Sequence, residues 1–282
     1  MNKIKGLILV FLALSVSLGS MAQSSYEDWT YPSTAVKERK VIPHRYIREA
    51  NVKYYKRVHR VIDTREKQNL IMHWPRNPFY RVITEAAYKG EGAEGGIRAF
   101  RNDSLSSFYT PDELKERGGS EFVTTIADWR YPDDPYAFKD TTMLIQFKPE
   151  DIKKYRIMED WVFDHTYSDF RANIIAIAPL FEQSSSGIAL GEVPLFWVKM
   201  AELREILVNQ ELFNPYNDAA RMSFDDFFEM RMFNSYIVKE SNVWDMDIKY
   251  FEEFKDDGIA ALLESDRIKN DLFIFEHDLW EY

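Results

Sequence analysis

The sequence predicts an α+β fold, built as one compact unit behind an extended N-terminal arm. Segments with helical spacing and helix-start signals are mixed with strand-like segments along the chain, and such a mixture with antiparallel strands is typical of this class. The clearest strand signal is a hairpin near residues 157–178. No internal repeat is apparent, and the sequence has no cysteine. An exported chain of roughly 260 residues can nevertheless bury a large core without disulfides.

Residues 1–22 have the features of a secretory signal peptide. A short basic region precedes an apolar run over residues 6–18, and small residues lead up to the expected cleavage between Ala22 and Gln23. The alternative, a membrane anchor, is disfavoured because the run is shorter than the about 20 residues that span a bilayer and no stop-transfer pattern follows. A lipoprotein signal needs a cysteine at the cleavage point, and there is none. We therefore expect an exported, unlipidated chain with no direct membrane insertion, held at a membrane only through a partner.

Charge is distributed unevenly along the sequence. Residues 23–100 hold 15 Lys/Arg and 9 Asp/Glu, whereas residues 101–282 hold 19 and 37. The basic excess is concentrated over residues 37–67, which include Arg57 and Arg60, with eleven Lys/Arg against four Asp/Glu. This segment is either a solvated helix face or a basic surface that meets the acidic body of a second copy or of a partner, where complementary charge sets orientation and association rate. Nucleic acid is not expected to bind an exported acidic protein.

Spacing and capping signals place the elements of the N-terminal half. Residues 23–43 show no clear period and are interpreted as the arm, so the domain is expected over residues 44–282. Apolar residues at helical spacing, with basic residues between them, predict a mostly helical segment over residues 47–69. A later helix has Thr110 as N-cap, Pro111 as its first residue and Glu113 to close a capping box. The other expected elements are a helix over 77–89, a glycine loop over 90–96, strands over 122–129 and 143–147, and a short helix over 149–154.

The predicted hairpin has a regular alternation of side chains. Its strands cover residues 157–164 and 170–178, with residues 165–168 as the turn. Because successive residues of a strand point to opposite faces, Asp160 and Asp164 share one face, and Glu159 lies on the other. After the hairpin we expect a loop over residues 184–187, a short strand over 195–198 and a helix over 200–209.

Residues 214–242 combine carboxylates, arginines, aromatics and amides in one stretch. A turn over 214–218 leads to Ser223, the expected N-cap of a helix that runs from Phe224 to about Lys239 with a wide apolar face. Arg231 has no acidic partner three or four residues away, so we expect a tertiary or intersubunit carboxylate. Asp225 and Glu229 are like charges at helical spacing and favour a cation between them, either Arg221 or a residue of another chain.

An alternative interpretation is that Asp225 and Asp226 only cap the helix and bind no cation. Two more helices are expected, near residues 248–254 and 259–268.

Catalytic signals are weak. The five histidines are dispersed, so no metal site is expected, and no cofactor either, because the glycine loop lacks the Lys-Ser/Thr of a phosphate-binding loop. Paired carboxylates in EDWVFD (159–164) and the surface aromatics leave one enzymatic alternative, an exported carbohydrate-active enzyme or glycan-binding module that uses Asp160 and Asp164. The other interpretation is a solvated hairpin face paired with Arg171.

Several blocks together resemble a known family. NPYNDAARMSFDDFFEMRMFNSYIVKESN (214–242) is similar to a signature of the GldN/PorN family of gliding-motility and type IX secretion proteins of Bacteroidota. EDWVFD followed by IIAIAPL (174–180), VPLFWVKMAELREIL (193–207), and IDTREKQN with the following WPRNP (62–69 and 74–78) fit the same family. The similarity extends from about residue 45 to the end of the sequence.

The resemblance implies a periplasmic structural subunit rather than an enzyme. Members of the family assemble with an outer-membrane lipoprotein, GldK/PorK, into a ring, and the ring is expected to engage the inner-membrane motor protein GldM/PorM. Self-association within that ring is implied as well. The candidate interaction residues are then Arg57, Arg60, Arg221, Asp225 and Arg231.

Overall fold

The computed structural model describes residues 35–117, 120–127, 138–145, 147–185, 188–217, 219–255 and 257–279. The expected leader, the cleavage site at Ala22 and Gln23, and residues 23–34 of the arm lie outside the described residues. Within them, the protein combines helices with antiparallel strands, as the α+β prediction requires.

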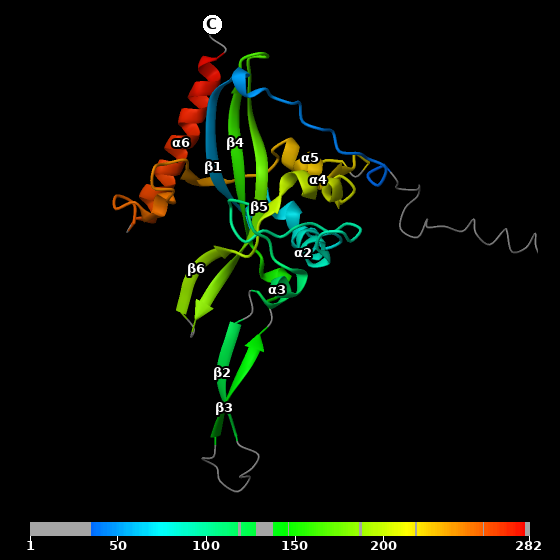
Figure 1. Ribbon diagram of the computed structural model, residues 1–282, viewed down its shortest axis with the longest axis vertical. Helices are drawn as coiled ribbons and strands as arrows, with labels where there is room; N and C mark the ends of the chain where they lie inside the picture. The colour runs from blue at the N-terminus through cyan, green and yellow to red at the C-terminus, as the bar shows by residue number, and fades with distance from the viewer. Residues whose placement is uncertain are drawn as a thin grey trace, which may run out of the picture.

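A curved antiparallel sheet forms the centre of the molecule (Figure 1). Six strands of the described chain make it up: they follow the order β10-β1-β4-β5-β6, and β7 pairs with β5. Their bounds are β1 Val52–Asp63, β4 Lys154–Asp164, β5 Asp169–Ser185, β6 Ile188–Pro194, β7 Val198–Lys199 and β10 Tyr236–Glu240. Two separate pairs are β2 (Ser120–Ala127) with β3 (Phe138–Ile145), and β8 (Glu211–Leu212) with β9 (Met222–Ser223).

The helical prediction for residues 47–69 is wrong, because strand β1 occupies most of that segment. It lies between β10 and β4 and pairs antiparallel with both. Its C-terminal half is buried almost without interruption, so the alternation that marks a half-buried strand is missing from the sequence. Only the short 3₁₀ turns η1 (Glu49–Asn51) and η2 (Leu70–His73) flank it.

The predicted hairpin is confirmed as β4 and β5. The two strands pair from Asp164↔Asp169 to Lys154↔Leu180, with a bulge between Met158 and Glu159. Strand β5 continues to Ser185 and pairs there with β6, so the first two residues of the loop expected over 184–187 belong to the strand, and the last two lie outside the described residues. The strand expected from residue 195 is the shorter β7.

Strands β2 and β3 form a second hairpin that projects from the body of the molecule (Figure 1). The strand expected over residues 122–129 corresponds to β2, and its last two residues lie outside the described part of the chain. Strand β3 begins earlier than expected and ends before Phe147.

Helices on one side of the sheet enclose the main core (Figure 1). They are α2 (Phe79–Lys89), α3 (Pro111–Glu116), α4 (Met200–Leu207) and α5 (Phe224–Glu229). The capping box of Thr110 and Glu113 is confirmed at the start of α3. Aromatic rings fill the core, where Phe79 packs against Tyr155, Phe224 and Phe228 with ring centroids 4.9–5.3 Å apart.

The helix predicted from Phe224 to Lys239 is too long, because α5 stops at Glu229. Arg231 has a φ of 53°, which no α-helix continues through, and Tyr236–Glu240 then pairs with β1 as strand β10. Helix α6 (Gly258–Asp278) is longer than predicted, and a 3₁₀ turn, η4 (Ile248–Tyr250), replaces the helix expected near residue 248. Helix α6 covers the free edge of β10, where Ser265 Oγ accepts a hydrogen bond from the Ile237 N–H at 2.8 Å.

Candidate functional site

Ser223 is the N-cap of α5, as predicted, and with Asp226 it forms a capping box that fixes the first turn. Ser223 Oγ accepts a hydrogen bond from the Asp226 N–H at 3.1 Å, and Asp226 Oδ2 accepts one from the Ser223 N–H at 2.9 Å. The phenylalanines of α5 point into the core and are fully buried. The carboxylates of the same short helix therefore lie on its other side, facing α4 and the N-terminal segment.

Arg204 of α4 supplies the cation between the like charges of α5. Its Nε donates to Asp225 Oδ1 at 2.7 Å, and its Nη2 donates to Asp225 Oδ2 at 3.2 Å. Glu229 Oε1 lies 3.4 Å from the same Nε. Within this chain Arg204 therefore supplies the cation expected between Asp225 and Glu229, and the helix cap is made by Ser223 and Asp226. Burial opposes the charge of Arg204, but the Asp225 carboxylate outweighs it and raises the pKa of Arg204.

Residues 35–48 cross this acidic side of α5 (Figure 1). They comprise the described part of the expected arm and the first residues of the expected domain, and this segment is called the arm from here on. Arg39 forms an ion pair with Asp226 and donates to the Arg221 carbonyl at 2.9 Å. His44 Nε2 lies 2.9 Å from Glu229 Oε1. Arg204 Nη2 completes the attachment by donating to the Ile42 carbonyl at 3.1 Å. Arm, α4 and α5 together line a groove of ≈ 740 Å³, which we call the arm site.

Arg231 has the tertiary partner that its sequence position predicts. Its Nη2 donates to both oxygens of Glu159, at 2.9 and 3.1 Å. Glu159 lies on β4, 72 residues away, and its side chain is completely buried. Arg221 is bonded to Glu211 on β8. Both arginines therefore join segments of the same chain.

Arg60 is buried beside this pair. Its Nε donates to Ser235 Oγ at 2.9 Å. Burial lowers the pKa of Arg60, and the nearby Glu159 carboxylate opposes that effect. Arg57 is much less buried than Arg60, because it lies on the solvent-facing side of β1 and its side chain is 41% exposed.

The carboxylates of the hairpin are also paired within the chain. Asp160 accepts two hydrogen bonds from Arg57, at 2.7 and 2.9 Å. Asp164 is buried and accepts from the Thr166 N–H at 2.9 Å, inside the hairpin turn. The cavity beside Asp164 measures ≈ 20 Å³, about the space of a single water and far smaller than a sugar. Arg171 pairs with Asp169 rather than with Asp160 or Asp164.

Of the five predicted interaction residues, only Asp225 lines the arm site. The sequence reasoning missed Arg39, His44 and Arg204, which hold the arm. For Arg204 a signal was present, since it sits within the apolar stripe of Met200, Leu203 and Leu207. A cation on that stripe predicts a buried carboxylate. Arg39 and His44 carry no comparable local signal.

Other kinds of site find little support in the described chain. Its His, Asp and Glu side chains include no group of three or more arranged to hold a metal ion. None of its helices is both long enough and apolar enough to cross a bilayer.

The arm site is made of charged side chains bonded to one another and to backbone carbonyls, so it attaches the arm to α4 and α5 of its own chain. The family described as gliding motility associated protein GldN matches residues 47–281. The match covers most of the chain, so the protein belongs to the GldN family and is a component of the gliding-motility and type IX secretion machinery. This confirms the family predicted from the motifs. A search of curated proteins finds no match.

Proposed function

We propose that this chain is a periplasmic structural subunit of the type IX secretion and gliding machinery. It is exported by the leader of residues 1–22 and cleaved between Ala22 and Gln23. It forms a ring with an outer-membrane lipoprotein of the GldK/PorK kind and engages the periplasmic part of a GldM/PorM-like motor. The observation that carries the proposal is the family match over residues 47–281.

Attachment to the outer membrane runs through the lipoprotein. The sequence contains no cysteine that could carry a lipid, so the partner's lipid anchor holds this chain. The internal ion pairs support a scaffolding role, because they fix the arm and the hairpin in one arrangement before any partner binds. A preorganised surface loses less conformational entropy on binding.

Co-purification from outer membranes tests this proposal. A tagged copy expressed in its native bacterium is expected to co-elute with the lipoprotein in assemblies much larger than one chain. In a matched strain whose lipoprotein lacks its lipidated cysteine, the same assemblies are expected in the soluble periplasmic fraction. A tagged chain that always elutes alone and never accompanies the lipoprotein would overturn the proposal.

Among the predicted interaction residues, Arg57 is the one with the most exposed side chain. Arg57→Glu is expected to weaken assembly more at low salt than at high salt, because exposed charges are screened by ions. The matched control is Arg57→Met, which removes the pairing with Asp160 without reversing the charge. If Arg57→Glu assembled as well as Arg57→Met at every salt concentration, Arg57 would not belong to the interface.

A further inference from the structure

Helix α6 is apolar on two opposite faces. Its inner face buries Ile268 and Leu272 against the sheet edge and η4. Its outer face exposes Ile259, Leu262, Leu263, Phe273 and Ile274, with Ile259 72% exposed. The outer residues recur at helical spacing (i, i+3, i+4, then i+14, i+15) and so form one stripe. Exposed apolar side chains that gather on one side of a helix mark a surface for protein–protein contact.

A groove adjoins the first turns of this stripe. It has a volume of ≈ 370 Å³ and is bounded by β10, η4, the β6 side of the sheet and the start of α6. Tyr250 and Leu262 line the groove, and both are also exposed. A volume of this size accepts one or two large side chains. The stripe and the groove together are called the α6 face.

The helix side of the α6 face carries an excess of negative charge, whereas the groove is lined by two acidic side chains, Glu192 and Asp247, and two basic ones, Arg156 and Lys249. Residues 243–279 contain eleven Asp/Glu and four Lys/Arg. Glu252, Glu253 and Asp266 are exposed, and Asp266 lies on the stripe itself. A partner that covers this face must therefore bring apolar side chains together with positive charge.

The outer side of the arm has that composition. Ile42 and Tyr46 are among the most exposed apolar side chains of the described residues, at 77% and 87%. Lys37, Lys40 and Arg48 are exposed alongside them. The side chains that bind the arm to α5 are Arg39 and His44, whereas Lys40 and Ile42 border the arm-site groove and Ile42 is attached only through its carbonyl. The exposed side of the arm thus remains available while the arm stays attached to its own chain.

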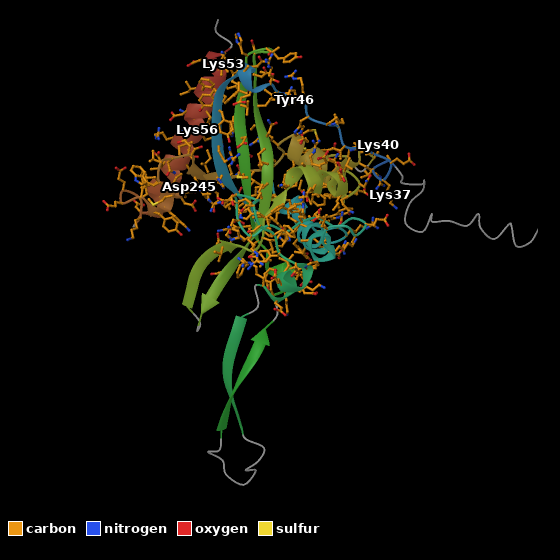
Figure 2. All side chains as sticks on the ribbon, viewed as in Figure 1. Lys37, Lys40, Tyr46, Lys53, Lys56 and Asp245 are labelled. Carbon is orange, nitrogen blue, oxygen red and sulfur yellow. The ribbon has the colours of Figure 1, made fainter. Side chains whose placement is uncertain are left out.

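Figure 2 shows Lys37 and Lys40 at one side of the molecule, Asp245, which precedes η4, at the other, and Tyr46 between them near the end of the sheet. A second copy can bring its exposed arm side chains to the α6 face without moving either arm away from its own α5.

We propose that the outer side of the arm of one copy docks on the α6 face of a second copy. Tyr46 or Ile42 enters the groove, and the arm lysines and Arg48 lie against the acidic border. The contact is head-to-tail and leaves one arm and one α6 face free at the ends of each assembly, so it extends into a ring if its rotation closes. This inference rests on the proposed function, and it assigns the surfaces for self-association.

Two double variants test the contact from both sides. One changes the arm (Ile42→Ser with Tyr46→Ala), and the other changes the helix (Ile259→Ser with Leu263→Ser). Sedimentation velocity of the purified chain is expected to show oligomers that grow with concentration and loosen with added salt, and each double variant is expected to stay monomeric. A mixture of the two variants is expected to form dimers only, because each retains one intact surface. The matched control, Leu70→Ser with Tyr216→Ala, changes exposed apolar side chains elsewhere and is expected to associate like the unmodified chain.

Disulfide trapping provides a second measurement that does not depend on weakening the contact. Because the sequence contains no cysteine, Tyr46→Cys and Leu263→Cys each introduce the only thiol. Mild oxidation of the mixed single variants is expected to give cross-linked dimers at a yield at least tenfold above that of either variant alone. Equal yields from each variant alone would contradict a head-to-tail contact.

Three outcomes would overturn the inference. One is an unmodified chain that stays monomeric at every concentration, and another is a mixture of double variants that fails to pair. The third is an α6 variant that still self-associates but no longer binds the lipoprotein, which would assign the α6 face to that partner. The proposed function fails independently, if the unmodified chain is never recovered with the lipoprotein.

Discussion

Replacing Arg204 with methionine is expected to lower the free energy of unfolding by about 3 kcal/mol. The side chains of Arg204 and Asp225 are only 7% and 9% exposed. Methionine retains much of the aliphatic packing but leaves the Asp225 carboxylate buried without its cation. Breaking a buried pair in this way costs roughly 3–5 kcal/mol. We take the lower end because the positive N-terminal end of the helix dipole favours a carboxylate in the first turn of α5.

The same substitution is expected to loosen the arm, since Arg204 also donates to the Ile42 carbonyl. Chemical denaturation measures the stability change, and the melting temperature is expected to fall by about 6–12 °C. Limited trypsin digestion measures the loosening, because Lys37 and Lys40 lie on the arm. Cleavage there is expected to become faster under native conditions.

The matched control is Arg57→Met, which removes a bidentate pair that is partly exposed. It is expected to cost at most about 1 kcal/mol, because solvent screens such pairs. Adding Asp225→Asn to Arg204→Met is expected to restore part of the lost stability, because the buried charge disappears. The reasoning would be refuted if Arg204→Met and Arg57→Met cost the same, or if Asp225→Asn made the Arg204 variant worse.

Three further predictions concern the fold. Burial and the neighbouring cations lower the pKa of His59 from 6.5 to about 3, so the unfolded chain binds a proton over this range and the folded chain does not. Stability should therefore decline below about pH 6.5, by up to about 1.4 kcal/mol per pH unit from this group, and His59→Gln should remove that part of the slope in denaturation curves. Ser223→Ala should cost about 1 kcal/mol in urea unfolding by removing the α5 cap, whereas Ser106→Ala, at an exposed loop position, should cost almost nothing. Gly90→Ala should lower the melting temperature clearly, because Gly90 has a φ of 73° and an added Cβ would lie 2.6 Å from Pro111 Cγ.

Structural features that depend on signals within a few residues were predicted correctly from the sequence. The N-caps at Thr110 and Ser223 and the capping box of Thr110 depend on residues within three positions, and the β4–β5 hairpin joins neighbouring strands by a short turn. The length of α5 was not predictable in the same way. Its apolar pattern continues past Glu229, and the helix ends because Tyr236–Glu240 pairs with a strand about 180 positions earlier in the chain.

In the candidate site, too, local features were predictable from the sequence and long-range partners were not. The sequence indicated that Arg231 and Asp225 need partners of opposite charge, because an unpaired buried charge is costly. It did not identify Glu159 or Arg204, since local spacing says nothing about which distant segments meet. For residues 47–69, the C-terminal half of β1 is buried on both faces of the sheet, so its sequence lacks the alternation that marks a half-buried strand.

The sequence by itself determined the α+β class, the family, the main capping signals and the absence of cysteine, because these depend on composition and short-range pattern. Only the tertiary structure decided that the basic arm lies across the acidic side of α5 and that α6 keeps a second apolar face exposed. Both are long-range consequences of packing, in which ion pairs and buried area join residues far apart in the chain. The physical reason is that a charge or an apolar stripe specifies the kind of partner it needs, whereas the fold specifies which one it meets.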